Sequence, residues 1–265
     1  MYHINMKEGK AMKHLIKADF KKITFLSSHR NYLTILCLLS ISFGLIFLFT
    51  LGVTQEKHLT ELPAIEVIDI SLLGMDVAAI MLIIFTATFI AKEFSHGSIH
   101  TSLAIMPLRQ KFYLSKILFI GILSLIISVT LTLIIFGLDQ IVLFANNMDT
   151  VSLNNLALLS RLIGVVILPI FYSLLSAAGT FYFQSAAGGM MFSIGVMFLP
   201  ALMKLFPASF SDTVLILLPE KSLHALTEMD TVIFSVRLMS AILILLLWIV
   251  ISNILGLWKL IKADF

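Results

Sequence analysis

The run LTILCLLSISFGLIFLFTLGV, from Leu33 to Val53, carries no charged residue and decides the class of fold. A helix that crosses the hydrocarbon core of a bilayer needs about 20 mainly apolar residues, and this run is long enough. Further runs of the same kind follow it, and no linker rich in Pro, Gly or Ser separates them. Residues 1–265 are therefore predicted to form one all-α integral membrane domain. Its six predicted membrane-spanning helices are Leu33–Val53, Ser71–Ala91, Ile117–Gly137, Leu162–Phe183, Gly188–Phe206 and Val232–Trp258.

The composition of the whole chain agrees with a lipid environment. Hydrophobic residues make up 59% of the chain and charged residues 12%, whereas soluble domains are about 45–50% apolar and about 25% charged. A core formed by 265 residues cannot hide so much apolar surface, so much of it must face lipid. The single cysteine, Cys37, excludes a disulfide within a monomer. The net charge of only +3 gives no reason to expect a nucleic-acid partner.

Lys and Arg residues gather at alternate ends of the predicted helices. Cytoplasmic loops carry an excess of Lys and Arg, so the richer side is expected to be the cytoplasm. Placing the N-terminus there puts most of the 18 basic residues inside, and six spans return the C-terminus to the same side. The inner residues are Lys7, Lys10, Lys13, Lys17, Lys21, Lys22, Arg30, Lys92, Arg109, Lys111, Lys116, Lys259 and Lys262, and the outer ones are Lys57, Arg161, Lys204, Lys221 and Arg237.

The hexapeptide LIKADF occurs twice, as Leu15–Phe20 and as Leu260–Phe265. Around the first copy, apolar residues recur at helical spacing and lysines lie largely opposite, so Lys10–Ser28 is predicted to be a basic amphipathic helix. Such a helix lies in the membrane interface, with its apolar stripe in lipid and its lysines toward anionic headgroups. The two copies then resemble two cytoplasmic anchors, and chance recurrence is the alternative. The predicted apolar stripe is Met12, Leu15, Ile16, Phe20, Ile23 and Leu26.

The inner loop between the second and third spans, residues 92–116, is too polar to cross the membrane. Glu93 closes the second span, and Gly97 permits a sharp bend. A short helix, Ser98–Met106, is predicted next, and it ends because Pro107 cannot continue it. We expect this helix to lie along the cytoplasmic face and to pass a push from a partner into the bundle. A loop that only sets topology is the alternative. The apolar positions that indicate the helix are Ile99, Leu103 and Met106.

The order of Glu93, Gly97, a short apolar helix, Pro107 and Arg109 resembles the first cytoplasmic loop of ABC-2 type permeases. These are the membrane subunits of bacterial ABC exporters with the type V arrangement. The resemblance covers nearly the whole chain, because the basic amphipathic helix, the six spans and a half-apolar outer segment before the last span also match. Small permeases that export antimicrobial or cytolytic peptides are the most similar branch in size.

This resemblance implies a dimer, expected to be a homodimer, in the bacterial cytoplasmic membrane, with one ABC ATPase subunit docked beneath each half. It implies that Ser98–Met106 is the coupling helix seated in the ATPase, with Glu93 and Arg109 as the polar contacts beside it. The expected substrate is an amphipathic peptide, with a drug, a lipid or a polysaccharide as open alternatives.

The sequence holds no G-x-x-x-x-G-K-[ST] motif, which cradles nucleotide phosphates in P-loop proteins. We therefore expect the chain not to be an enzyme and to bind no cofactor, with ATP and Mg²⁺ on the partner ATPase. His96 and His100 have the i, i+4 spacing of metal ligands, but no third ligand is evident, so no metal site is predicted.

Asp76 is the acidic residue placed well inside a predicted span. Ionisable groups at that depth are costly and are functional candidates by default. Asp76 either attracts a cationic substrate on its path or pairs with Arg161 or Arg237. Two other classes of protein stay open: a stand-alone ion-coupled transporter, which predicts ionisable residues in several spans, and a membrane immunity protein that binds peptides without transporting them.

Polar and small residues inside the spans predict how the helices contact one another. Asn253 and Gln184 are expected to form hydrogen bonds between helices. The small-residue runs Ser176–Thr180 and Ala186–Gly189 are expected to let helices approach closely.

Overall fold

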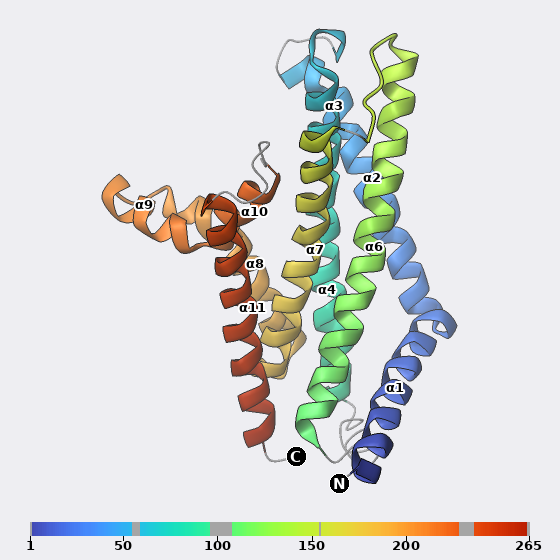
Figure 1. Cartoon of the computed structure of the whole chain (residues 1–265), viewed down its shortest axis with the longest axis vertical. Helices are drawn as coiled ribbons and strands as arrows, with labels where there is room; N and C mark the ends of the chain where they lie inside the picture. Colours follow the sequence, from blue (N-terminus) through green and yellow to red (C-terminus); the bar gives the residue numbers. More distant parts are fainter. Residues whose placement is uncertain (1, 55–58, 96–107, 154, 228–235, 264–265) are drawn as a thin grey trace.

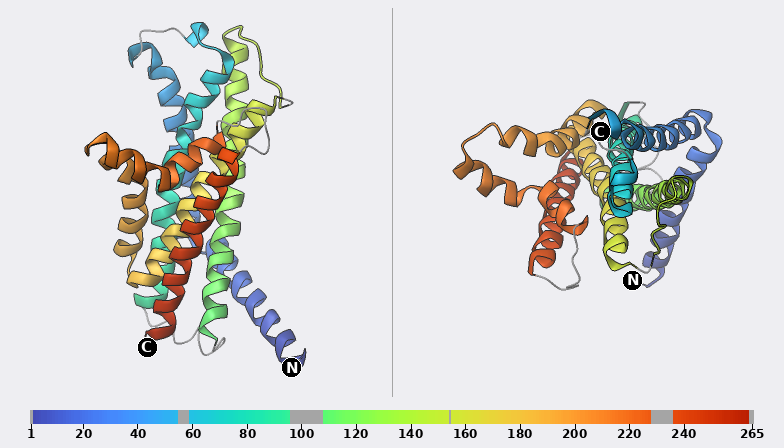
Figure 2. Two further views of the ribbon diagram at one scale, coloured as in Figure 1. Left: turned by 60° about the vertical axis from the view of Figure 1, so that its left-hand side comes forward. Right: turned by 90° about the horizontal axis from the view of Figure 1, so that it is seen from above.

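The computed structural model describes residues 2–54, 59–95, 108–153, 155–227 and 236–263. Within these ranges the regular structure is helical, and no strand is present (Figure 1). Most helices run along one long axis, whereas α9 lies across it (Figures 1 and 2). The elements are α1 (Tyr2–Phe25), α2 (Ser27–Thr54), the 3₁₀ helix η1 (Leu59–Glu61), α3 (Ala64–Leu72), α4 (Gly74–Ser95), α6 (Arg109–Ala145), α7 (Leu156–Phe183), α8 (Ala186–Met203), α9 (Ala208–Leu217), α10 (Pro219–Thr227) and α11 (Val236–Lys262).

The structure confirms six helices long and apolar enough to span a membrane. The third of them differs most from its predicted bounds, because α6 has 37 residues and extends beyond Ile117–Gly137 at both ends. A helix of that length measures ~55 Å, well over the ~30 Å of the hydrocarbon core. The membrane-spanning segments are Ser27–Thr50, Ala64–Phe94, Arg109–Ala145, Leu158–Phe183, Ala186–Met203 and Leu238–Lys262.

Helices α4 and α7 pack against each other at the centre, with α2 on α4, and with α6, α8 and α11 on α7. Small residues allow this approach. A Cβ atom added at Gly179 of α7 lies 2.9 Å from the ring of Phe192 of α8, and one added at Gly189 meets Thr180. The two small-residue runs therefore mediate close packing of α7 and α8, as predicted.

A second close approach joins α2 to the junction of α3 and α4. A Cβ atom at Gly44 lies 2.5 Å from the backbone oxygen of Ser71, and one at Gly74 meets the backbone oxygen of Ser40. Backbone atoms cannot turn aside as a side chain can, so these two positions require glycine.

Hydrogen bonds between helices supplement this packing. The Tyr113 hydroxyl of α6 donates to Asn253 Oδ1 of α11 at 2.8 Å, which confirms the predicted role of Asn253. The Ser176 hydroxyl of α7 donates to the backbone oxygen of Ile83 in α4 at 2.9 Å. Gln184 Nε2, by contrast, is buried without a hydrogen-bond partner among the described residues.

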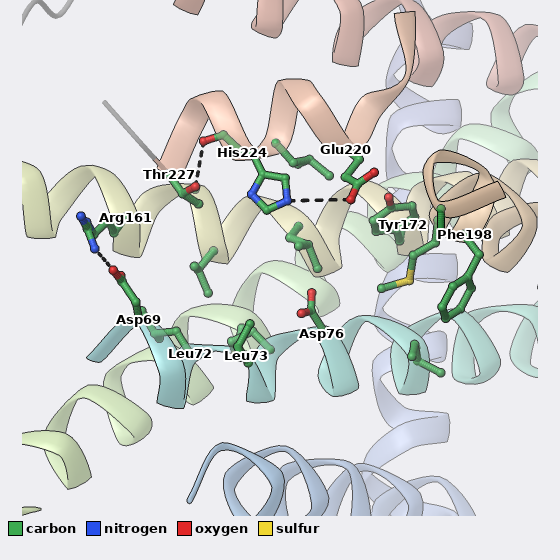
Figure 3. A pocket seen from close by; sticks show the side chains of 18 residues that line it. Asp69, Leu72, Leu73, Asp76, Arg161, Tyr172, Phe198, Glu220, His224 and Thr227 are labelled. Atoms are coloured by element: carbon green, nitrogen blue, oxygen red, sulfur yellow. Dashed lines mark hydrogen bonds and ion pairs between the residues drawn. The ribbon is translucent and has the colours of Figure 1, made fainter. Parts of the chain in front are cut away.

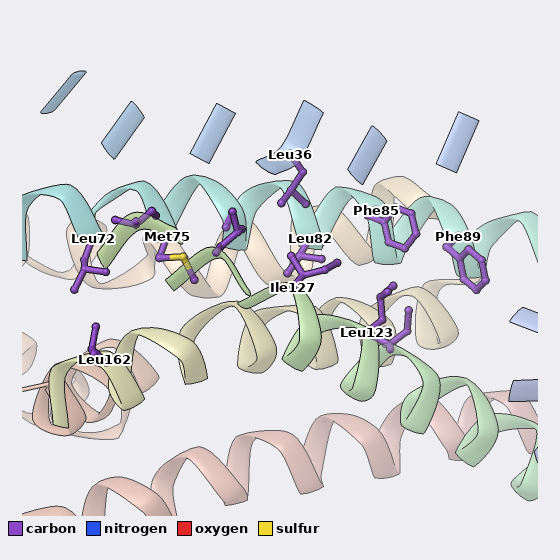
Figure 4. Close-up of a cluster of buried hydrophobic side chains, with 14 of the residues drawn as sticks. Leu36, Leu72, Met75, Leu82, Phe85, Phe89, Leu123, Ile127 and Leu162 are labelled. Carbon is purple, nitrogen blue, oxygen red and sulfur yellow. The ribbon is translucent and has the colours of Figure 1, made fainter. Parts of the chain in front are cut away.

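Buried apolar side chains from α2, α4, α6 and α7 fill the centre of the bundle (Figure 4). A row of aromatic rings continues this core toward α1. The ring centroids of Phe85 and Phe89 are 5.7 Å apart, those of Phe89 and Phe119 5.2 Å, and those of Phe119 and Phe20 5.0 Å. These separations are typical of favourable aromatic pairs. The row joins α4 and α6 to α1.

Helix α1 forms, and its apolar stripe packs partly against protein, whereas the prediction placed it in lipid. The helix ends at Phe25, earlier than the predicted Ser28. Lys13, Lys17 and Lys21 are exposed, as expected for the basic face. Ile23 is buried, and the other described stripe residues except the exposed Leu26 pack against the core beside α6. A stripe that contacts lipid and a stripe that contacts another helix look the same in sequence, because both surroundings are apolar.

Helix α1 begins and α11 ends at the same end of the bundle, which we call the termini end (Figure 1). The opposite end, where α3 lies, is the far end. The start of the first helix and the end of the last helix therefore lie on one side of the bundle, as six spans require. That this side is the cytoplasm stays a prediction.

Candidate functional site

Four charged side chains meet near the termini end, where α1, α4 and α6 pack together. Lys116 Nζ of α6 lies 2.8 Å from Asp19 Oδ1 of α1 and 2.9 Å from Glu93 Oε1 of α4. Lys22 Nζ of α1 donates to the same Glu93 oxygen at 3.0 Å and lies 3.6 Å from Asp19 Oδ1. The two cations balance the two carboxylates. We call Asp19, Lys22, Glu93 and Lys116 the ion-pair cluster.

Three of the four members of the ion-pair cluster are almost closed to solvent. The side chain of Lys116 is 2% exposed and its carboxylate partners 3% and 5%, whereas Lys22 is 44% exposed. The rings of Phe89 and Phe112 lie 5.4 and 5.6 Å from Lys116 Nζ, close enough for an aromatic face to attract a cation. Charges so deeply buried are tolerated only when they are paired. The cluster therefore ties three helices into one arrangement.

Lys22 is a member of the cluster outside the membrane-spanning segments. Burial on its own lowers the pKa of an ammonium group. The hydrogen bond and the charge of Glu93, with Asp19 beside it, outweigh burial and raise the pKa of Lys22 above its ordinary value. Lys22 is therefore a cation at neutral pH, as its place between two carboxylates requires.

Arg109 forms a second attachment at the termini end. Its Nη1 atom donates to the backbone oxygens of Leu260 at 3.1 Å, Ile261 at 2.8 Å and Ala263 at 2.5 Å. The last carbonyl groups of a helix have no partners within it, and a cation there also suits the helix dipole. Arg109 therefore caps the C-terminus of α11.

Both ends of the inner loop, residues 92–116, are thus attached to other helices. Each attachment uses one copy of LIKADF, because Asp19 belongs to the first copy and the carbonyl groups that Arg109 binds belong to the second. The middle of the loop lies outside the described residues, so the helix Ser98–Met106 stays a prediction. Also outside them are His96, Gly97, Ser98, Ile99, His100, Leu103, Met106 and Pro107.

A pocket of about 640 Å³ opens among α3, α4, α7, α8 and α10 (Figure 3). Its lining includes residues of α3, which lies at the far end of the bundle (Figure 1). Its walls are mainly apolar, and Leu72, Leu168 and Met197 are representative. The polar side chains in its lining are Asp69, Asp76, Arg161, Tyr172, Glu220, His224 and Thr227. We call it the far-end pocket. It combines a large apolar surface with several charges.

The charges in the far-end pocket do not balance. Arg161 forms an ion pair with Asp69, so the predicted pairing of Arg161 with Asp76 is wrong. Among the described residues, the carboxylate of Glu220 lies 3.9 Å from the imidazole of His224. Asp76 lies in the first turn of α4, where the helix dipole favours a negative charge. It forms no ion pair with a described side chain, and the side chain of Arg237, its other predicted partner, lies outside the description.

Asp139 is a buried acid of a membrane-spanning helix, and the sequence analysis placed it outside the spans because the third span was ended at Gly137. It lies in α6 and is fully buried. Its Oδ2 atom is 2.6 Å from the Ser71 hydroxyl, and its Oδ1 atom has no partner among the described residues. The ion-pair cluster was also missed, although Asp19 offered a signal as an acid on the apolar side of α1.

The fold and these sites define the chain as a multi-pass α-helical membrane protein. Within the described ranges, no three or more His, Cys, Asp or Glu side chains gather as metal ligands. The sequence matches no protein-family model. No curated protein is significantly similar to it. The resemblance to ABC-2 type permeases therefore stays a prediction, drawn from the organisation of the chain.

Proposed function

We propose that this chain is the membrane subunit of an ATP-driven exporter that moves amphipathic peptides out of a bacterial cell. A separate ATPase subunit supplies the energy, and two copies of the chain form the transport unit in the cytoplasmic membrane. The termini end faces the cytoplasm in this proposal.

The attachment of both ends of the inner loop is the observation that supports the proposal most. A push on a loop moves helices only if the loop is firmly joined to them. Glu93 joins its start to α1 and α6, and Arg109 joins its end to α11. An ATPase that pushes on the loop therefore acts on four helices at once, counting α4, which carries Glu93.

The far-end pocket supports the choice of substrate. An amphipathic peptide presents an apolar face and a charged face, and the pocket offers apolar walls together with carboxylates. In the proposed orientation the pocket lies on the outward side of the bundle.

A stand-alone ion-coupled transporter is the second candidate function. The observation that favours it is Asp139, a fully buried acid within a membrane-spanning segment other than that of Asp76. Ionisable residues inside the membrane often form proton or ion pathways.

Co-purification tests the proposed function. The tagged chain is extracted gently from its native membrane, the proteins that accompany it are identified, and ATP turnover is measured in lipid nanodiscs. We expect an ATPase with a P-loop to accompany the wild type. We expect Arg109→Gln to keep that ATPase and to lose coupling between ATP turnover and transport. Glu66→Gln, on the exposed surface of α3, is the control. The proposal fails if no ATPase accompanies the wild type and turnover stays at background.

A further inference from the structure

We propose that the far-end pocket is a binding site for one turn of a cationic amphipathic helix, with Asp76 and Glu220 as the counter-charges for a Lys or Arg side chain of the ligand. The further step, that this ligand is also the transported substrate, rests on the proposed function. Binding of the ligand does not depend on the proposed function, and it can be measured without an ATPase.

The balance of charge in the pocket favours a cation. Among the described lining residues, the guanidinium of Arg161 is already paired with Asp69. Asp76 and Glu220 then leave an excess of negative charge, which His224 offsets only when it is protonated. Carboxylates next to apolar walls attract a ligand cation more strongly than carboxylates in bulk water do, because the surroundings are less polarisable.

The place of these side chains suits a ligand with two faces. Asp76 projects from α4 and Glu220 from α10, on opposite sides of the pocket (Figure 3). The ring of Tyr172 lies in the wall contributed by α7, and aromatic rings also attract cations. Leu72, Met197 and other apolar residues form the rest of the wall. A cation can therefore reach carboxylates while its apolar neighbours contact this wall.

The size of the pocket limits what it can hold. Its volume of about 640 Å³ is within the range of ligand sites. One turn of an α-helix with its side chains fills a cylinder of ~500 Å³, taking a rise of ~5.4 Å and a diameter of ~11 Å. The pocket therefore holds about one turn and not a whole peptide helix.

Two other kinds of occupant fit less well. An anion meets the excess of carboxylates and finds Arg161 already paired. A metal ion needs several ligands converging on one point, and no such group of three is found in the described part of the chain. An organic cation with an apolar body agrees with both observations.

Direct binding tests this inference. The probe is a fluorescent amphipathic helix built from Leu and Lys, and the protein is held in nanodiscs of zwitterionic lipid, with empty nanodiscs giving the background. We expect Asp76→Asn and Glu220→Gln each to raise the Kd at least about tenfold. Glu66→Gln, outside the pocket, should leave the Kd unchanged. A probe with Glu in place of Lys should bind no better than background.

A variant with the opposite expected effect keeps the test independent of misfolding. Arg161→Gln releases Asp69 from its ion pair and so adds a third uncompensated carboxylate to the pocket. We therefore expect tighter binding of the Lys probe to Arg161→Gln. The inference is overturned if Asp76→Asn and Glu220→Gln leave the Kd unchanged, or if Arg161→Gln weakens binding as much as they do. Binding by a protein that brings no ATPase supports the site and removes only the exporter role.

Discussion

The two charged regions of this protein differ in whether their charges are compensated. In the ion-pair cluster two carboxylates and two ammonium groups balance, and Lys116 is 2% exposed. In the far-end pocket Arg161 is paired with Asp69, while Asp76 has no ionic partner within the described residues. A balanced, buried set of charges fixes helices relative to one another. An unbalanced set beside an open volume is suited to a ligand that brings the missing charge.

Lys116→Met should have the largest effect, because it removes the cation that both buried carboxylates share. Loss of one member of a buried ion pair costs about 3–5 kcal/mol. We expect a clear fall in the unfolding temperature in detergent. Lys17→Met, on the exposed face of α1, should change stability by less than about 0.5 kcal/mol. Adding Glu93→Gln to Lys116→Met should recover part of the loss, and strictly additive losses would count against a coupled cluster.

Arg109→Gln should have an intermediate effect. The guanidinium group donates to three backbone oxygens at the end of α11, and a hydrogen bond to a charged group is worth about 1.5–3 kcal/mol. We expect a loss of stability in that range, with earlier hydrogen exchange at the last turn of α11. Unchanged exchange there would show that the cap does not hold the helix end.

Asp76→Asn should act in the opposite direction on stability. The substitution removes a partly buried charge that has no ion pair among the described side chains. We therefore expect the free energy of unfolding to rise by ~1 kcal/mol while binding of the cationic probe weakens. Stability and binding measured on the same preparation check this. A fall in stability would mean that Asp76 has a structural partner, and the contrast between the two regions would disappear.

Lys22→Met should have the smallest effect, below about 1 kcal/mol, because solvent screens this half-exposed member of the cluster. The pKa of Lys22 is raised above its ordinary value of 10.5. Its contribution to the free energy of unfolding is therefore complete at a pH below 10.5 and is lost only as the pH rises through the raised pKa. The difference in unfolding temperature between wild type and Lys22→Met should therefore be constant from pH 7 to pH 9. A difference that shrinks over this range would contradict the assignment.

The number of membrane-spanning helices could be predicted from the sequence because each needs only a long apolar run, such as Leu33–Val53, and no partner. The close packing of α7 on α8 could be predicted for a similar reason, since the glycines are local. The surroundings of α1 could not be predicted, because lipid and a neighbouring helix select the same apolar stripe.

The candidate sites were harder to predict from the sequence than the fold was. Asp76 was identified because it lies within an apolar run, but its environment depends on Glu220 of α10, far away along the chain. The partners of Lys116 come from α1 and α4, and no spacing pattern relates them. Asp139 was missed because the third span was ended at about the length that crosses a bilayer, whereas α6 continues past Gly137 to Ala145.

ATP-dependent uptake of the Leu and Lys peptide into inverted proteoliposomes tests the central claim most directly. The vesicles contain the chain together with the ATPase that co-purifies with it. The account predicts uptake that needs ATP. Asp76→Asn should reduce this uptake through weaker binding, and Arg109→Gln should uncouple uptake from ATP turnover. Uptake driven by a proton gradient without ATP would contradict the account and would establish the ion-coupled transporter instead.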